Sequence, residues 1–109
     1  MELLAEYYRE MYNAEMITDG KTYFIIYNIY DDRSLFVRLT FITKESRGKK
    51  SLTFIENKVI EKEDPISIWC EIEKKNKNWD RIAHTYIRRR GYNIFDTNDE
   101  RVKLYRSLK

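Results

Sequence analysis

Apolar and acidic positions in the first twenty residues recur with the period of a helix. Apolar side chains lie three and four positions apart, which is typical of one face of an amphipathic helix. They are Leu3, Leu4, Tyr7, Tyr8, Met11 and Tyr12. Asp19-Gly20 is a turn signal. The pattern predicts an N-terminal helix that ends before this turn.

Residues 21–60 predict three antiparallel strands. The segment 21–30 is rich in aromatic and β-branched residues, and 34–43 alternates apolar and polar positions. Both patterns are typical of strands. The expected elements are then a tight turn at 31–33, a charged hairpin loop at 44–50 and a third strand at 51–60.

The segment 64–91 is predicted to form one long helix. Asp64 and Pro65 suit a helix start, and Gly91 suits a left-handed helix end. Apolar residues between them keep a period of 3.6, so the helix would be about 39 Å long. The alternation of Ile66, Ile68, Cys70 and Ile72 favours a strand over 66–73 instead. Both alternatives stay open.

A short strand is expected at Tyr92–Phe95, followed by a last helix. Thr97 and Glu100 have the spacing of a capping box, with Val102, Tyr105 and Leu108 inside. The fold class is therefore α+β, with one domain over residues 1–109. It is a three-stranded antiparallel meander with an optional short fourth strand, an N-terminal helix, one long helix and a C-terminal helix. Their order is α-β-β-β-α-(β)-α.

Composition narrows the class of protein. Of the 109 residues, 42% are hydrophobic and 36% charged, which is too apolar for disorder and too charged for a membrane protein. No apolar run approaches a membrane span, and the acidic N-terminus is unlike a signal peptide. We expect an intracellular, cytoplasmic protein without a membrane partner. Small proteins of this type are frequent in phage and virus genomes, which would make the compartment the host cytoplasm.

Few residues have the chemistry of a catalytic site. Cys70 is the only cysteine and His84 the only histidine, and Asp80 lies one helical turn before His84. On one helix Cys70 and His84 would be roughly 21 Å apart, which excludes a Cys–His pair. No Gly-rich phosphate loop and no nucleophile elbow is present. The sequence predicts no cofactor and no metal site, and it favours a protein that is not an enzyme.

One catalytic alternative remains, a metal-dependent nuclease. Glu56-Asn57-Lys58 is an E-x-K triplet on the expected third strand. With this triplet the element order resembles that of the PD-(D/E)xK nuclease superfamily. The resemblance implies a divalent metal between Asp32 and Glu56, with Lys58 beside the phosphate. The register of the meander argues against it, because Glu56 would face Arg38 and lie roughly 20 Å from Asp32.

The basic C-terminal part suggests a nucleic-acid surface. Residues 74–109 hold eleven Lys and Arg against four acids. A basic face of the long helix and a basic hairpin tip would contact phosphates, in an element order similar to that of double-stranded-RNA-binding domains. Cations at a helix end also interact with its dipole, so the arginine run has a structural explanation as well. The candidate residues are Lys44, Arg47, Lys49, Lys50, Lys74, Lys77, Arg81, Arg88, Arg89 and Arg90.

The first strand suggests a protein interface. One of its faces carries Tyr23, Ile25, Tyr27 and Ile29. A homodimer or a partner protein would cover this aromatic face, unless helices bury the strand on both sides. The leading hypothesis is thus a small non-enzymatic protein that binds nucleic acid. The second is a protein–protein interaction module, such as a small inhibitor or adaptor, that acts through the acidic first helix and the tyrosine-rich sheet.

Overall fold

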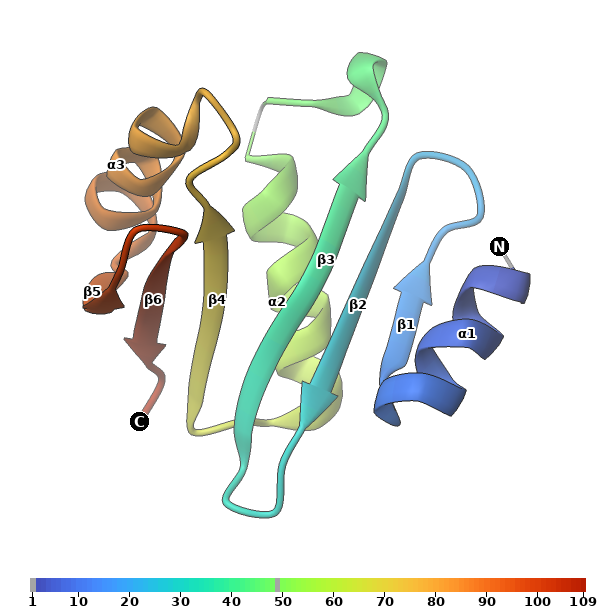
Figure 1. The fold of residues 1–109 in the computed structure, drawn as a ribbon. Helices are drawn as coiled ribbons and strands as arrows, with labels where there is room; N and C mark the ends of the chain where they lie inside the picture. The colour runs from blue at the N-terminus through green and yellow to red at the C-terminus, as the bar shows by residue number, and fades with distance from the viewer. Residues whose placement is uncertain (1, 49) are drawn as a thin grey trace.

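A computed structural model describes residues 2–48 and 50–109. These residues form a mixed six-stranded sheet with strand order β1-β2-β3-β4-β6-β5 (Figure 1). The strands are β1 (Glu15–Thr18), β2 (Tyr23–Ile29), β3 (Ser34–Ile42), β4 (Ser67–Glu73), β5 (Asn93–Thr97) and β6 (Arg101–Ser107). The helices are α1 (Glu2–Tyr12), α2 (Ser51–Glu63) and α3 (Trp79–Arg90), with the short 3-10 helix η1 (Lys44–Ser46).

The two central strands of the sheet are parallel. Residues of β3 pair in parallel register with β4, whereas the other neighbouring strands pair antiparallel. A parallel pair needs a crossover connection, and α2 supplies it. The carboxyl ends of β3 and β4 therefore lie at the same edge of the sheet, where the β3–α2 loop also lies (Figure 1).

The main core lies between the sheet and two helices. Helices α2 and α3 pack on one face through Ile55, Val59 and Ala83, which belong to the same buried cluster as Tyr27 and Leu35. The Tyr27 hydroxyl donates a hydrogen bond of 2.6 Å to Glu63 at the end of α2. Helix α1 lies on the opposite face of the sheet, beside β1 (Figure 1). Over β3 and β4 that second face carries no helix of the described residues (Figure 1).

The prediction of a third strand at 51–60 is wrong, because this segment forms α2. Its β-branched residues have strand propensity, but Ile55 and Val59 are four positions apart and both are buried against the sheet. Tertiary burial of a helical face outweighs the local propensity here. The loop 44–50 is consequently a strand-to-helix connection rather than a hairpin tip.

The prediction of one long helix over 64–91 is also wrong. The strand alternative is the correct one, since β4 buries Ile68, Cys70 and Ile72 on alternate positions. Asp64 ends α2 in a left-handed conformation with φ 47°, so Asp64-Pro65 marks a helix end rather than a start. Gly91 ends α3 with φ 73°, as predicted.

The prediction of a C-terminal helix is wrong, because β5 and β6 form an antiparallel hairpin. The side chain of Asn98 accepts hydrogen bonds from the amides of Glu100 and Arg101, which makes a turn where a capping box was expected. Val102 and Leu104 are buried on alternate positions of β6. The three-stranded meander is thus replaced by a six-stranded mixed sheet, although α1, β2 and β3 lie where the pattern predicts them. No helix in the described ranges is long and apolar enough to cross a membrane.

Candidate active site

The parallel strands β3 and β4 separate toward their carboxyl ends. Their register contains four pairs, from Ser34–Ser67 to Val37–Cys70. Both strands continue beyond the last pair, β3 to Ile42 and β4 to Glu73. Figure 1 shows the two arrows diverging over this stretch. The backbone groups on the facing edges of both strands therefore lack ladder partners there.

A β-bulge accompanies the separation. Ile26 of β2 pairs with Leu39, and Tyr27 pairs with Val37, so Arg38 has no partner in β2. An extra residue in one strand bends it and re-aims its side chain. The bulge lies directly after the last β3–β4 pair, where β3 turns away from β4.

A cavity of about 570 Å³, which we call the strand cleft, fills the space between the separated strands. In an open α/β sheet, the crevice beyond the carboxyl ends of parallel strands is the usual ligand site. The residues that line it come from β3, β4, the β4–α3 loop and α3, and they face both sides of the sheet. They are Val37, Arg38, Leu39, Thr40, Cys70, Glu71, Ile72, Glu73, Lys75, Asn76, Ile82 and Tyr86.

The N-terminus of α2 is open to an anion. Lys50 is the N-cap residue, has φ 63° and makes no side-chain capping hydrogen bond. The first turn of α2 contains no acidic residue. Helix N-termini carry free N–H groups and a partial positive charge, so an uncapped one favours phosphate groups.

A second cavity, the α2 cavity, adjoins this helix start. It has a volume of about 420 Å³ and lies between α2 and α3. Its lining combines a positive-φ glycine, hydroxyl groups and arginines, a set that suits phosphate oxygens. The lining residues are Gly48, Lys50, Ser51, Leu52, Thr53, Thr85, Arg89 and Arg90.

A buried ion cluster lies beside the α2 cavity. Glu56 of α2 is paired with Arg90 and, at 2.8 Å, with Arg106, and accepts a hydrogen bond of 2.8 Å from the Tyr92 hydroxyl. One carboxylate thus faces two guanidinium groups, which leaves a net positive charge. Nη1 of Arg90 and Nε of Arg106 are buried without a hydrogen-bond partner among the described residues. Burial raises the pKa of Tyr92, with the Glu56 charge as the next cause, so its hydroxyl stays protonated and keeps donating.

Two titratable side chains line the strand cleft on the helix side. Burial is the main cause that raises the pKa of Cys70 to about 12 and that of Tyr86 above its usual value. Cys70 is therefore a neutral thiol at physiological pH and a poor nucleophile. Tyr86 keeps its proton, so its hydroxyl is a hydrogen-bond donor in the strand cleft.

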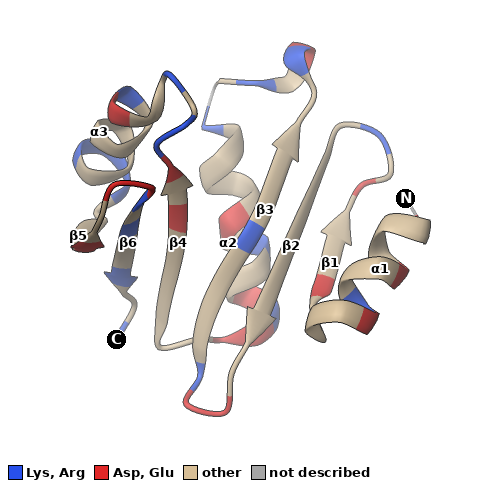
Figure 2. Cartoon of the chain, viewed as in Figure 1, with Lys and Arg blue, Asp and Glu red and all other residues tan. Residues whose placement is uncertain are grey.

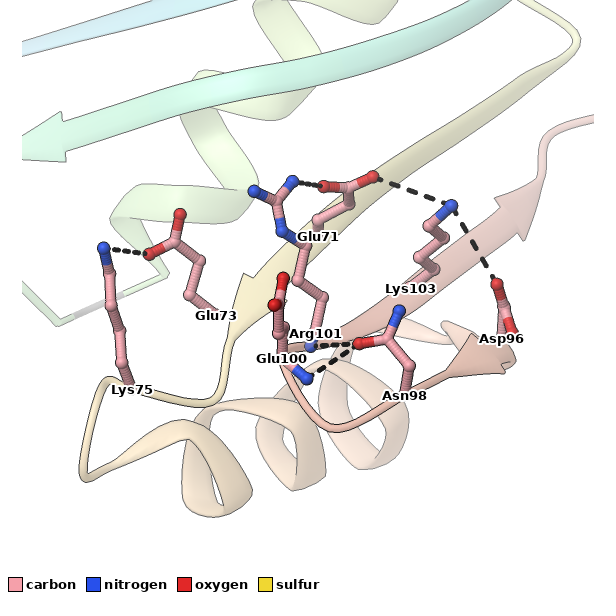
Figure 3. Close-up of polar contacts among 8 residues, drawn as sticks. All are labelled: Glu71, Glu73, Lys75, Asp96, Asn98, Glu100, Arg101 and Lys103. Carbon is pink, nitrogen blue, oxygen red and sulfur yellow. Dashed lines mark hydrogen bonds and ion pairs between the residues drawn. The ribbon is translucent and has the colours of Figure 1, made fainter.

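The opposite side of the strand cleft carries two carboxylates, each with a cationic partner. Glu71 and Glu73 alternate with Cys70 and Ile72 along β4 and so point to the other face of the sheet. Figure 3 shows the Glu71 carboxylate between Arg101 at 2.7 Å and Lys103 at 3.9 Å. Glu73 pairs with the exposed Lys75 at 3.1 Å.

The expected nucleic-acid residues do not form one surface. Lys74 and Lys77 lie in the β4–α3 loop, and Arg81 and Arg88 lie on α3, so these four residues do not share one helix. Lys44 and Arg47 lie at η1, and Lys49 lies outside the described residues. Figure 2 shows these basic segments apart. Three of the residues, Lys50, Arg89 and Arg90, come together at the α2 cavity.

The nuclease residues do not converge. Glu56 is buried with Arg90 and Arg106, whereas Lys58 is exposed on α2. Asp32 lies in the β2–β3 turn and accepts a hydrogen bond from Ser34. The expected cross-strand pair of Glu56 with Arg38 does not form, because Glu56 lies on α2 and not on a strand. Residues 2–48 and 50–109 contain no group of three side chains that could hold a metal ion.

The expected interface strand lies in the core. Ile25 and Tyr27 are 1% and 0% exposed, and Tyr23 and Ile29 pack against the same cluster. Helix α2 covers this face, so it offers no free surface to a partner. His84 and Asp80 form the predicted pair on α3, at 3.7 Å.

Sequence reasoning missed the strand cleft and the α2 cavity. The signal was Arg47-Gly48 and the basic and hydroxyl residues around it, between a strand and a helix. A glycine-containing loop that leads from a strand into a helix is an anion-binding arrangement. It was not recognised because 51–60 was predicted as a strand.

Comparison with solved protein structures identifies the fold. No protein-family model matches the chain, and no curated protein does. Among solved structures, the chain is similar to N-acetyltransferase PseH of Campylobacter jejuni in complex with acetyl coenzyme A, with a TM-score of 0.68 and 11% identity. That match covers 95% of this chain and 74% of PseH.

Two further solved structures are also similar to this chain over most of its length. The PaiA N-acetyltransferase of Thermoplasma acidophilum with coenzyme A has a TM-score of 0.65 and 16% identity, over 98% of this chain and 70% of that one. A Bacillus subtilis acetyltransferase in complex with CoA has a TM-score of 0.66 and 13% identity. That match covers 99% of this chain and 84% of the Bacillus subtilis chain. The chain therefore has the GNAT acetyltransferase fold.

These matches correct the functional predictions. The three solved structures named above are acetyltransferases with acetyl coenzyme A or CoA bound, rather than nucleic-acid-binding proteins. The hypothesis of a non-enzymatic nucleic-acid-binding protein is therefore wrong. The interaction-module and nuclease alternatives lack support from the matches as well.

Proposed function

We propose that the protein is an acetyl-CoA-dependent acetyltransferase that acts on an amine. The observation that carries the proposal is the strand cleft, which begins where β3 and β4 cease to pair, at the same edge of the sheet as the uncapped start of α2 (Figure 1). The bound CoA in the structural neighbours supports it.

The residues present fit coenzyme A. The free N–H groups at the start of α2, together with Lys50 and Arg89, would hold the diphosphate. The net positive charge of Arg90, Arg106 and Glu56 lies nearby and adds to the attraction. Unpaired backbone of β3 beyond Val37, about 16 Å long at the rise of a strand, would pair with the amides of the extended arm.

The two faces of the sheet would receive the two substrates. The α2 cavity lies on the face covered by α2 and α3, so the donor would enter from that face. Glu73, whose cationic partner is the exposed Lys75, lies on the opposite face and would attract a cationic amine. The donor would supply an acyl thioester, and the substrates would meet in the strand cleft between them.

The chain would handle two protons in this transfer. The amine attacks the thioester carbonyl carbon, a C–N bond forms, and the C–S bond breaks to release a thiolate. Glu73 would accept the proton of the amine, directly or through water, because its ion-pair partner is the exposed Lys75. The Tyr86 hydroxyl, which keeps its proton, would donate it to the leaving thiolate.

Binding of acetyl-CoA tests the proposal. Calorimetry and thermal unfolding would be measured with acetyl-CoA, CoA and, as a polyphosphate control, ATP. Acetyl-CoA and CoA should bind and raise the melting temperature by several degrees at saturation. ATP lacks the arm that would fill the strand cleft and should bind more weakly. Absence of binding at about 1 mM acetyl-CoA, or equal binding of ATP, would overturn the proposal.

A further inference from the structure

Arg38 lies at the bulge in β3 and lines the strand cleft. It has no partner in β2, and it follows the last β3–β4 pair directly. In Figure 2 the one basic position of β3 and the acidic end of β4 lie on the two strands that border the strand cleft. A cation is therefore placed opposite carboxylates, on either side of the cavity.

The guanidinium group of Arg38 is held in one orientation. Its Nε donates a hydrogen bond to Oδ1 of Asn28. Asn28 is buried and donates in turn to the carbonyls of Tyr12 at 2.9 Å and Asn13 at 3.2 Å. The guanidinium carbon lies 4.4 Å from the centre of the Tyr12 ring and 5.0 Å from that of Phe36. Such a fixed arginine is pre-organised for an acceptor.

This arginine has no carboxylate partner. Within residues 2–48 and 50–109 Arg38 forms no ion pair, whereas Arg90, Arg101 and Arg106 all do. Its Nε is committed to Asn28, which leaves the Nη groups for another acceptor. A half-buried, oriented guanidinium group without a carboxylate suits a bidentate bond with an external one.

The space in front of Arg38 is small. A cavity of about 190 Å³, the tyrosine pocket, lies on the face opposite α2 and is lined by Tyr8, Tyr12, Phe36, Arg38, Glu71 and Glu73, with Val37 and Arg101. It shares Val37, Arg38, Glu71 and Glu73 with the strand cleft. Its volume is below the usual range for drug-sized ligands, so the part of an acceptor that it holds is small.

We propose that the acceptor is a free amino acid, with its carboxylate bound by Arg38 and its α-amine held near Glu73. The inference rests on the proposed acetyltransferase function. The products are an N-acetyl amino acid and free CoA: the amine nitrogen gains the acetyl group, and the CoA sulfur gains a proton. A polyamine or a peptide N-terminus lacks a free carboxylate beside the amine and leaves Arg38 unused.

The test compares amino acids with their amides. Acetyl transfer to alanine, methionine and tyrosine, and to their amides, would be followed by thiol release, with kcat and KM determined for each. The amide keeps the amine and the side chain and removes the negative charge. The wild type should favour the acids by about 10–100-fold in kcat/KM, the value of one or two charge-assisted hydrogen bonds.

The variants assign the preference to Arg38. Arg38→Gln should raise KM for the acids by the same factor and leave the amides unchanged, and Arg38→Lys should keep part of the preference. Arg88→Gln, an exposed arginine of α3, is the matched control and should behave as the wild type. The pKa of the amine differs between an amino acid and its amide. The decisive quantity is therefore the ratio of kcat/KM for the acid to kcat/KM for the amide, compared between the wild type and Arg38→Gln.

Two failures are distinguishable. If the wild type binds CoA and acetylates amides as well as acids, or if Arg38→Gln keeps the preference for acids, the assignment of the acceptor is wrong and the acetyltransferase function stands. Loss of CoA binding in Arg38→Gln also overturns the assignment, because Arg38 then serves the donor. If the wild type does not bind CoA, the proposed function itself is wrong.

Discussion

Glu56 of α2 and Arg90 of α3 form an ion pair whose side chains are 6% and 7% exposed. The pair joins α2, whose N-terminus is uncapped, to the end of α3, which lines both cavities. Glu56 also binds Arg106 of β6 at 2.8 Å, so one carboxylate connects three elements. A buried carboxylate between two guanidinium groups is costly to remove, because both cations lose their counter-charge.

Glu56→Ala should therefore lower the free energy of unfolding by about 3–5 kcal/mol. Urea unfolding followed by circular dichroism measures the loss. Glu61→Ala, at an exposed position of the same helix, is the control and should change stability by no more than about 0.5 kcal/mol. Equal losses of unfolding free energy in the two variants would show that the buried cluster contributes no more to stability than an exposed glutamate does.

A negative charge at the N-terminus of α2 should stabilise the free protein and weaken the binding of CoA. Thr53 is exposed in the first turn and lines the α2 cavity. Thr53→Glu adds a negative charge where the helix dipole favours one, so the free protein should gain about 0.3–1 kcal/mol. The same charge repels a diphosphate, so CoA affinity should fall by about tenfold or more. Urea unfolding and calorimetry measure the two effects.

Thr53→Gln separates charge from size in this experiment. It fills the same space without the charge and should alter CoA affinity by less than Thr53→Glu does. If Thr53→Glu were to leave the CoA affinity unchanged, the diphosphate would have to bind elsewhere. The placement of the donor at the start of α2 would then be wrong.

The sequence pattern predicted the parts of the fold in which one periodicity dominates. The first helix, with its apolar stripe, and the two following strands lie where the pattern placed them. Gly91 ends a helix as expected, because a left-handed residue is needed there and glycine adopts it without strain.

The errors arise where two periodicities fit the same residues. Ile68 and Ile72 are four positions apart and also lie on one face of a strand, so spacing alone does not separate a helix from β4. Asp64-Pro65 fits a helix start and a helix end equally well. Because residues 51–60 were predicted as a strand, the helix that connects β3 to β4 in parallel was not predicted. The strand cleft, which depends on that parallel pair, was therefore not predicted either.

The site depends on long-range geometry that local patterns do not encode. Arg38 and Glu71 are 33 positions apart and face each other only because β3 and β4 pair at one end and separate at the other. The arginine-rich segment was noticed for its charge, but Glu56 neutralises part of that charge in the interior. A count of charges along the chain cannot distinguish a buried arginine from a free one.

Cys70 gives a test of the strand cleft that needs no variant. Burial is the largest cause that raises the pKa of its thiol to about 12. At pH 8 the thiolate fraction should therefore be roughly a thousandfold below that of a free cysteine. Reaction with Ellman's reagent should be slow in the native protein and fast in denaturant, and acetyl-CoA, which has no free thiol, should slow it further. Rapid labelling of the native protein would contradict the buried position of Cys70 in β4.

Tyr86 is predicted to donate the proton to the leaving thiolate. Tyr86→Phe keeps the ring against Tyr92 and removes only the hydroxyl. Turnover should fall by about a hundredfold, the usual contribution of a general acid, while CoA affinity stays unchanged. Stopped-flow or steady-state thiol release gives the rate, and calorimetry gives the affinity.

The pH dependence provides the second half of this test. Burial raises the pKa of Tyr86 above its ordinary value near 10, so its hydroxyl keeps its proton across the range in which the substrate amine loses one. The wild-type rate should rise with pH as the amine deprotonates and should not fall again below about pH 10. Tyr105→Phe, an exposed tyrosine of β6, serves as the control and should keep the wild-type profile. A full rate in Tyr86→Phe would mean that water or another group protonates the thiolate, and Tyr86 would then only shape the wall of the strand cleft.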